Sequence, residues 1–138
     1  MGWKECEKRH IRKVKVDEEK IKSLLKVCSV RLKFLEKQDV DRETASIISE
    51  GYYEIIKELL TALLLKKGLK SDNHECLVSF FKENFPDREY ETHMIYELKN
   101  IRNRIAYDGL FVEKVYLEKN KVEFKHIIEF LLKQIKEE

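Results

Sequence analysis

Residues that break helices are scarce in this chain, which has only four glycines and one proline in 138 residues. Sheets need frequent turns, and Gly and Pro provide most of the unusual turn conformations. A chain so poor in both is typical of long helices. Leu, Ile, Val and Phe recur regularly enough to form a core, although 39% of the residues are charged. The length fits one domain, so we predict a single all-α domain.

Apolar residues at helical spacing define five segments, at 17–36, 42–67, 72–84, 88–106 and 121–136. Asp17 can cap the first segment and Gly68 can end the second. Asn120 and Glu123 resemble a capping box at the start of the fifth. Short connections between long amphipathic helices predict an up-and-down bundle of four to five helices with antiparallel neighbours, formed by residues 17–138.

The segment 42–67 has the widest apolar stripe of the five. A wide stripe is typical of a helix that is covered on several sides. We therefore expect this helix at the centre of the bundle, with Gly51 allowing another helix to approach closely.

Residues 1–16 form a basic N-terminal arm with six Lys or Arg residues against Glu5 and Glu7. The net charge of the whole chain is only +2, so the basic character is local. Such an arm could contact phosphate or an acidic partner. The alternative is a solvated, poorly ordered terminus, and the sequence favours this second interpretation.

Cys6, Cys28 and Cys76 are odd in number and lack the spacing of a metal site. Free thiols in a reducing cytoplasm are the simplest interpretation. No secretory hydrophobic region is visible, and the longest apolar run, Leu59 to Leu65, is too short to span a bilayer. We therefore expect a cytoplasmic protein without a membrane segment.

Arg102 occupies an unusual position on the helix predicted at 88–106. At 100° per residue it falls within the same arc of about 120° as the apolar residues Met94, Ile95, Leu98, Ile101 and Ile105. Arg104 points the opposite way, into solvent. Two interpretations stay open for Arg102. It can pair with a glutamate or extend to the surface, or it can hold a phosphate in a forked grip.

The run from Lys99 to Gly109 resembles the signature of HEPN domains, in which an arginine, usually followed by a polar residue, precedes a histidine by four to six residues. Arg102 and Asn103 match the first part, and Tyr107 stands where the histidine is expected, followed by Asp108. The stretch from Tyr52-Tyr53 to Leu69, then His74 and Phe80, is similar to a prokaryotic HEPN branch in which an Arg…Asp-Tyr-type ending commonly replaces the Arg…His ending. The resemblance covers roughly residues 14–136.

The resemblance implies a homodimer of helical bundles with a composite groove where two arginine motifs meet. Many members are metal-independent ribonucleases, and others are partners of small nucleotidyltransferases in toxin–antitoxin pairs. It implies Arg102 and Tyr107 at the catalytic positions, no metal and no cofactor, and contacts to nucleotide or RNA phosphate from Arg102, Asn103, Arg104 and Asp108. Tyrosine titrates near pH 10 rather than near neutrality, which favours binding over cleavage.

Three functions remain open. The favoured one is a binding module that holds nucleotide or RNA phosphate, or pairs with a nucleotidyltransferase, without strong ribonuclease activity. The second is a metal-independent endoribonuclease that uses Arg102 with Tyr107, or with a histidine brought from elsewhere. The third is a purely structural dimeric interaction domain. Arg88 with His93, and the two Glu-x-x-His pairs ending at His10 and His126, are weaker candidates, and His74 is expected to make a local hydrogen bond.

Overall fold

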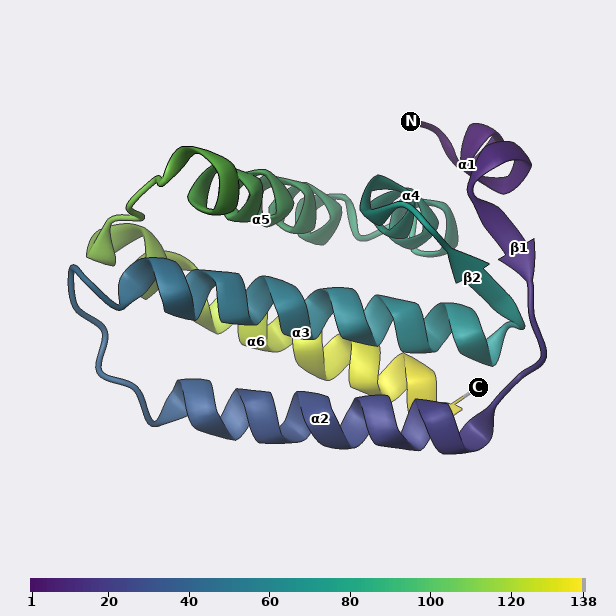
Figure 1. Ribbon diagram of the computed structural model, residues 1–138, viewed down its shortest axis with the longest axis horizontal. Coiled ribbons are helices and arrows are strands. Elements are labelled where there is room, and N and C mark those ends of the chain that lie inside the picture. The colour runs from purple at the N-terminus through teal and green to yellow at the C-terminus, as the bar shows by residue number, and fades with distance from the viewer. Residues whose placement is uncertain (138) are drawn as a thin grey trace.

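The computed structural model describes residues 1–137, which form six helices and two short strands. They are α1 (Trp3–Arg9), β1 (Ile11–Lys13), α2 (Glu18–Glu36), α3 (Ala45–Lys66), β2 (Leu69–Ser71), α4 (His74–Asn84), α5 (Glu89–Asp108) and α6 (Lys114–Glu137). The four long helices lie alongside one another, with α1, α4 and the strands at one end (Figure 1). This confirms the helical prediction, to which the structure adds a two-stranded sheet. In the part of the chain described, no helix is both long and apolar enough to cross a membrane.

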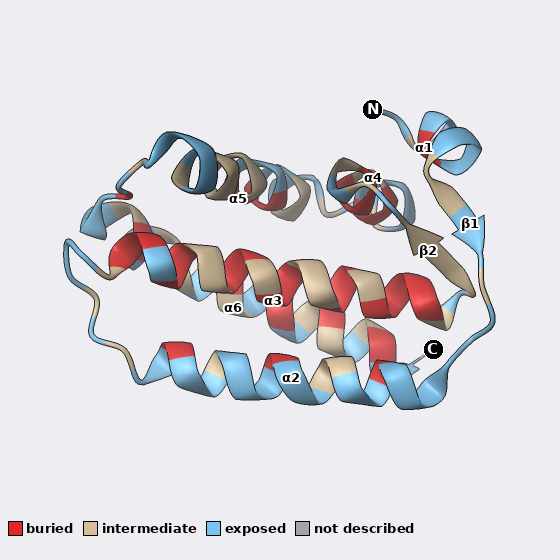
Figure 2. Ribbon diagram, in the orientation of Figure 1, coloured by how far each residue is buried: buried red, intermediate tan, exposed pale blue. Residues whose placement is uncertain are grey.

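Helix α3 lies at the centre of the molecule, as its wide apolar stripe predicts. Helices α2, α5 and α6 all pack against it, and most of its residues are buried, whereas α2 is exposed along most of its surface (Figure 2). Gly51 lets α2 pack closely against α3, because a Cβ at this position would lie 2.7 Å from the Leu35 side chain. The prediction of a close helix contact at Gly51 is confirmed.

Local signals set several helix ends. The Asp17 side chain accepts a hydrogen bond from the Lys20 amide at 3.1 Å and caps α2. After α3 the chain turns at Gly68, whose φ of 72° suits glycine best. Asn73 caps α4 by accepting bonds from the amides of Glu75 and Cys76 at 2.8 and 3.3 Å. The sequence predicts the roles of Asp17 and Gly68. Asn73 places the cap of α4 one residue later than the expected helix start at residue 72.

Helix α6 starts at Lys114, seven residues before the predicted start at 121. The predicted capping box at Asn120 is wrong, because Asn120 lies inside the helix and its side chain donates to the Tyr116 carbonyl at 2.8 Å. The added turns are stabilised by packing, since Leu117 is fully buried in the core. Burial of this leucine therefore outweighs a local start signal.

The N-terminal segment is ordered, so the expectation of a poorly ordered arm is wrong. Strand β1 pairs antiparallel with β2, and Ile11 lies opposite Ser71. Helix α1 packs on α4. Trp3 contacts the Phe80 ring edge-on with ring centres 5.5 Å apart. These contacts bring a segment that is basic in sequence against the end of the bundle.

Two of the three cysteines are bonded, so the prediction of three free thiols is also wrong. Cys6 of α1 and Cys76 of α4 form a disulfide across 70 residues of sequence, and both are fully buried. Cys28 is free and buried, and burial raises the pKa of its thiol to about 11. The spacing of the cysteines does not predict this disulfide, because Cys6 and Cys76 lie on helices that are brought together only by the fold. The disulfide removes the thiol argument for a reducing compartment.

Candidate functional site

Arg102 lies on the side of α5 that packs against α3. Its Nε is 3.6 Å from Oε1 of Glu54, and its Nη1 donates to Oδ1 of Asn103 at 3.4 Å. The arginine side chain is 27% exposed, so it is partly covered yet reachable from solvent. The structure thus shows the contact with a glutamate that one of the two interpretations predicts, while the phosphate-binding interpretation stays a prediction.

Glu54 is held more tightly by another cation. The Nζ of Lys57 lies 2.8 Å from the second carboxylate oxygen of Glu54, which is the usual length of a charge-assisted hydrogen bond. Both contacts of Arg102 are longer than this range. Its guanidinium is therefore positioned by Glu54 and Asn103 without being saturated by them, and it can still bind a stronger anionic partner.

The start of α4 adds a histidine to this neighbourhood. A surface pocket of about 360 Å³ is lined by Asp72, Asn73, His74, Glu75, Lys99 and Asn103. The pocket therefore joins the first turn of α4 to α5, and the amide end of a helix carries partial positive charge. We call Glu54, Lys57, His74, Lys99, Arg102 and Asn103 the Arg102 cluster.

The pKa of His74 lies below its usual 6.5. Partial burial of the ring is the main cause, because burial disfavours the charged imidazolium. Lys57, Arg102 and Lys99 lower the pKa further through their positive charges, while Glu54 raises it. His74 is therefore mostly neutral at pH 7 and responds to the electrostatic field of the cluster.

The carboxylate of Glu75 also borders the pocket, but it is engaged elsewhere. Its Oε1 accepts a hydrogen bond from the amino group of Met1 at 3.0 Å, and this bond lowers the pKa of Glu75. Ionised and paired in this way, Glu75 opposes an incoming anion less than an unpaired carboxylate would.

The other residues of the sequence motif stand apart from the cluster within one chain. Tyr107 is five positions after Arg102, which is about 140° around a helix. Its side chain is 80% exposed, and Arg104 and Asp108 are exposed as well. The structure thus brings Arg102 and Asn103 together with His74 and Lys99, but not with Tyr107. The predicted roles of Arg104, Tyr107 and Asp108 would require a second chain.

The sequence predicts only a local hydrogen bond for His74, besides its place in the HEPN resemblance. It gives no sign that this histidine lies close to the charges of Lys57, Lys99 and Arg102. The loop from Gly68 to Asn73, which includes β2, turns the chain back toward α5 (Figure 1). The sequence does not predict that His74 lies near Arg102, because the two residues belong to separate helices.

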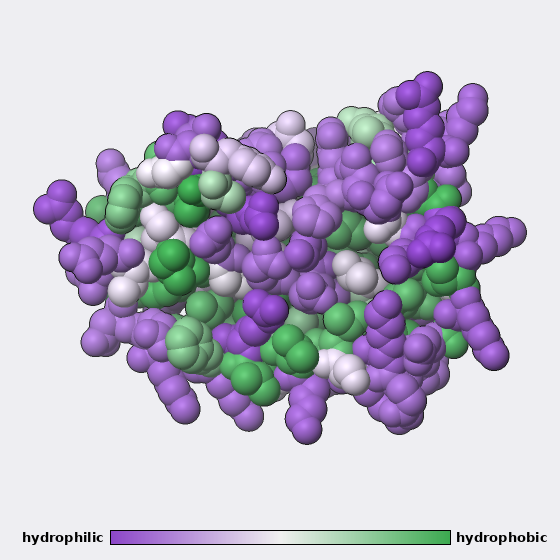
Figure 3. All heavy atoms as spheres, in the orientation of Figure 1, coloured by the Kyte–Doolittle hydropathy of each residue, from purple (hydrophilic) through white to green (hydrophobic). Residues whose placement is uncertain are grey.

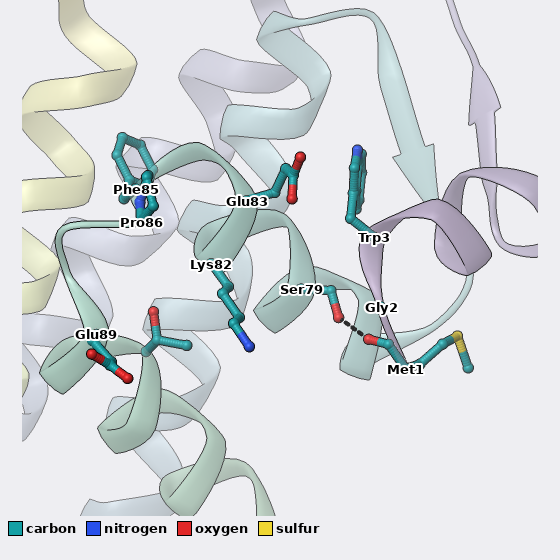
Figure 4. A pocket seen from close by; sticks show the side chains of 10 residues that line it. Met1, Gly2, Trp3, Ser79, Lys82, Glu83, Phe85, Pro86 and Glu89 are labelled. Atoms are coloured by element: carbon teal, nitrogen blue, oxygen red, sulfur yellow. Dashed lines mark hydrogen bonds between the residues drawn. The ribbon is translucent and has the colours of Figure 1, made fainter.

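A larger groove lies elsewhere, between the N-terminus, α4 and the start of α5. It encloses about 820 Å³. Figure 4 shows Lys82 extending between Glu89 and the Ser79 hydroxyl, which donates to the Met1 carbonyl. Because one lysine faces the two carboxylates of Glu83 and Glu89, this groove has no clear preference for an anion.

The weaker sequence candidates contact other groups. The Arg88 guanidinium lies over the Phe130 ring, 4.2 Å from its centre, whereas His93 is exposed and 3.8 Å from Glu97. The Glu123–His126 pair, at 3.8 Å, is on the surface of α6. Among residues 1–137 no three His, Cys, Asp or Glu side chains gather closely enough to hold a metal ion.

Exposed apolar side chains occupy other parts of the surface. Hydrophobic atoms gather over α2 and the neighbouring part of α3, whereas long hydrophilic side chains project at the end with α1 and β1 (Figure 3). Val27, Val30 and Phe34 contribute on α2. Tyr107, Phe111 and Val115 are also exposed, and we call the segment from the last turn of α5 to the first turn of α6, on which they lie, the α5–α6 end.

Comparison with family models, curated proteins and solved structures finds no match for this chain. The functional argument therefore depends on the residues and the geometry described above.

Proposed function

We propose that this chain is a HEPN-like helical protein that binds phosphate groups of a nucleotide or RNA through the Arg102 cluster. The observation that carries the proposal is the position of Arg102, which is directed by Glu54 and Asn103 at 3.6 and 3.4 Å without being saturated. An arginine fork matches two phosphate oxygens, so phosphate is a better partner than the single loosely held carboxylate.

The charges around Arg102 support an anionic ligand. Lys57 and Lys99 are half-buried cations of the cluster, and the carboxylate of Glu54 is mainly engaged by Lys57. The first turn of α4 adds the positive end of a helix of 11 residues, of which the Glu75 and Cys76 amides already donate to Asn73. Asn103 lines the same pocket and can donate to a phosphate oxygen through its amide nitrogen.

The proposal includes the arrangement that the HEPN resemblance implies. Two chains related by a two-fold axis would bring two arginine motifs to a composite groove, where Arg104, Tyr107 and Asp108 of one chain could face the cluster of the other. The exposed α5–α6 end offers apolar surface for such a contact. A small nucleotidyltransferase is the proposed protein partner, as in toxin–antitoxin pairs.

Binding of inorganic phosphate and of a nucleoside monophosphate, measured by calorimetry, tests the proposal. Arg102→Ala should weaken binding at least about ten-fold, equivalent to ~1.4 kcal/mol. Arg31→Ala, on the exposed surface of α2, is the control with the same change in charge. If the wild-type protein binds neither ligand, or Arg102→Ala binds as well as wild type, the chain is better described as a structural domain.

A second function, metal-independent RNA cleavage, is favoured by the position of His74, a partly buried ring whose pKa is lowered by burial and by the charges of Lys57, Arg102 and Lys99. A neutral imidazole can accept the proton of a 2′-hydroxyl as its oxygen attacks the adjacent phosphorus. The 5′-oxygen then leaves with a proton from water, and the product carries a 2′,3′-cyclic phosphate. Arg102 would stabilise the charge on the phosphorane oxygens.

Incubating structured RNA with the protein in EDTA separates cleavage from binding. Cleavage that His74→Gln abolishes, while phosphate affinity changes little, would support the enzyme. Absence of cleavage by the wild-type protein, or cleavage that persists in His74→Gln, would reject His74 as the proton acceptor and leave binding as the function.

A further inference from the structure

The β1–β2 ribbon places like charges directly opposite each other. Arg12 pairs in register with Lys70, and residues opposite each other in an antiparallel pair share one face of the sheet. Two cations in this arrangement repel each other and destabilise the pairing. Their presence is unfavourable for folding of the ribbon itself, and a polyanion would relieve the repulsion.

The ribbon also borders a pocket of its own. The pocket encloses about 440 Å³ and is lined by Arg9, His10, Ile11, Arg12, Lys70, Ser71 and Asp72. Its carboxylate, Asp72, is hydrogen-bonded to Nδ1 of His10 at 2.8 Å. Three cations, of which Arg9 also lies 3.9 Å from Glu5, therefore line a pocket whose carboxylate already has a partner, which leaves the pocket electropositive.

This second pocket adjoins the pocket beside Arg102. Asp72 lines both of them, and β2 leads through Asn73 directly into the first turn of α4. The disulfide between Cys6 and Cys76 ties α1, which precedes the ribbon, to α4. The two pockets are therefore held side by side at one end of the molecule.

We infer that the ribbon is a second phosphate-binding surface, so that the ligand is a nucleic-acid strand whose backbone runs from the Arg102 cluster across Arg12 and Lys70. This inference depends on the proposed function and specifies its substrate as a polymer rather than a mononucleotide. Positive grooves that follow a backbone bind several nucleotides with little sequence preference. The ribbon would bind phosphate through its cations, so affinity should depend strongly on salt.

Fluorescence anisotropy with labelled oligouridine of about 20 nucleotides measures strand binding, and uridine monophosphate measures the Arg102 cluster alone. The double variant Arg12→Gln/Lys70→Gln should weaken strand binding at least about ten-fold and reduce the salt slope by about 0.7 for each phosphate that is no longer neutralised. Its affinity for uridine monophosphate should equal that of wild type. Arg31→Gln/Lys33→Gln, on exposed α2, is the control that also removes one Arg and one Lys.

The thermal stability of the double variant distinguishes a binding role from a structural one. Because the substitutions relieve repulsion, the melting temperature should stay equal or rise. A lower melting temperature, or unchanged strand binding, would overturn the inference. A DNA strand of the same sequence distinguishes RNA from DNA as the source of the phosphodiester, and equal competition by polyglutamate would overturn the choice of a nucleic acid.

The proposed function and this inference can fail separately. If Arg102→Ala abolishes binding of both probes and the ribbon variant changes neither, only the ribbon inference fails. If Arg102→Ala changes neither probe while the ribbon variant weakens strand binding, the Arg102 proposal fails and the ribbon stands as the binding surface.

Discussion

Arg102 and Tyr107 belong to the same helix and to the same predicted motif, yet their surroundings are opposite. Arg102 is 27% exposed and contacts Glu54 and Asn103. Tyr107 is 80% exposed and lies in the last turns of α5, before Gly109 ends the helix with a φ of 66°. Five residues of separation turn one side chain toward α3 and the other about 140° away from it.

The difference shows what a linear motif determines and what it leaves to the fold. Helical periodicity alone predicts that the arginine of the motif lies on the apolar side of its helix. The partners of the arginine come from α3 and α4. The Arg102 cluster is thus assembled by packing, whereas the α5–α6 end depends on a second chain for any role in the site.

Removing the disulfide should produce the largest difference in stability between the end of the molecule with α1 and the ribbon and the end with Tyr107. Cys6→Ser/Cys76→Ser releases α1 from α4, and closing a loop of 70 residues stabilises a fold by about 4 kcal/mol in the chain-entropy account. Urea unfolding measures the loss of stability. Hydrogen exchange should accelerate in α1, β1 and β2 and change little near Tyr107. Equal acceleration at both ends would show that the disulfide supports the whole bundle and not one end.

Replacing Glu54 should have the next largest effect. Glu54→Gln leaves Lys57 and Arg102 without this carboxylate, which should lower the free energy of unfolding by about 1–2 kcal/mol. Phosphate should bind several-fold more tightly, because a competing anion is gone. Glu129→Gln, on exposed α6, is the control. Weaker phosphate binding in Glu54→Gln would contradict the position that we assign to Arg102.

The α5–α6 end should be the least sensitive region within one chain. Tyr107→Ser/Phe111→Ser removes two exposed rings and should change the unfolding free energy by less than about 0.5 kcal/mol for each site. Sedimentation equilibrium should show weaker self-association, as expected if these rings contribute to a dimer. Unchanged association would remove this surface from the proposed contact, and a large loss of stability would show that the rings serve the fold.

The sequence predicted what local patterns control and missed what long-range contacts control. Apolar periodicity identified the central helix and the contact at Gly51, and capping residues located the start of α2. The ribbon depends on pairing between residues near 12 and 70, and the disulfide depends on the same approach. His74 joined the site for the same reason, since the path of β2 brings it to α5.

The pKa of His74 in the presence of inorganic phosphate is the most direct test of the account. In NMR titrations of the His74 ring protons, the pKa of His74 in the unliganded protein should lie below 6.5. Phosphate in the cluster favours the imidazolium, so saturating phosphate should raise this pKa in wild type and have no such effect in Arg102→Ala. An unchanged pKa in wild type, or the same rise in Arg102→Ala, would contradict phosphate binding at this cluster.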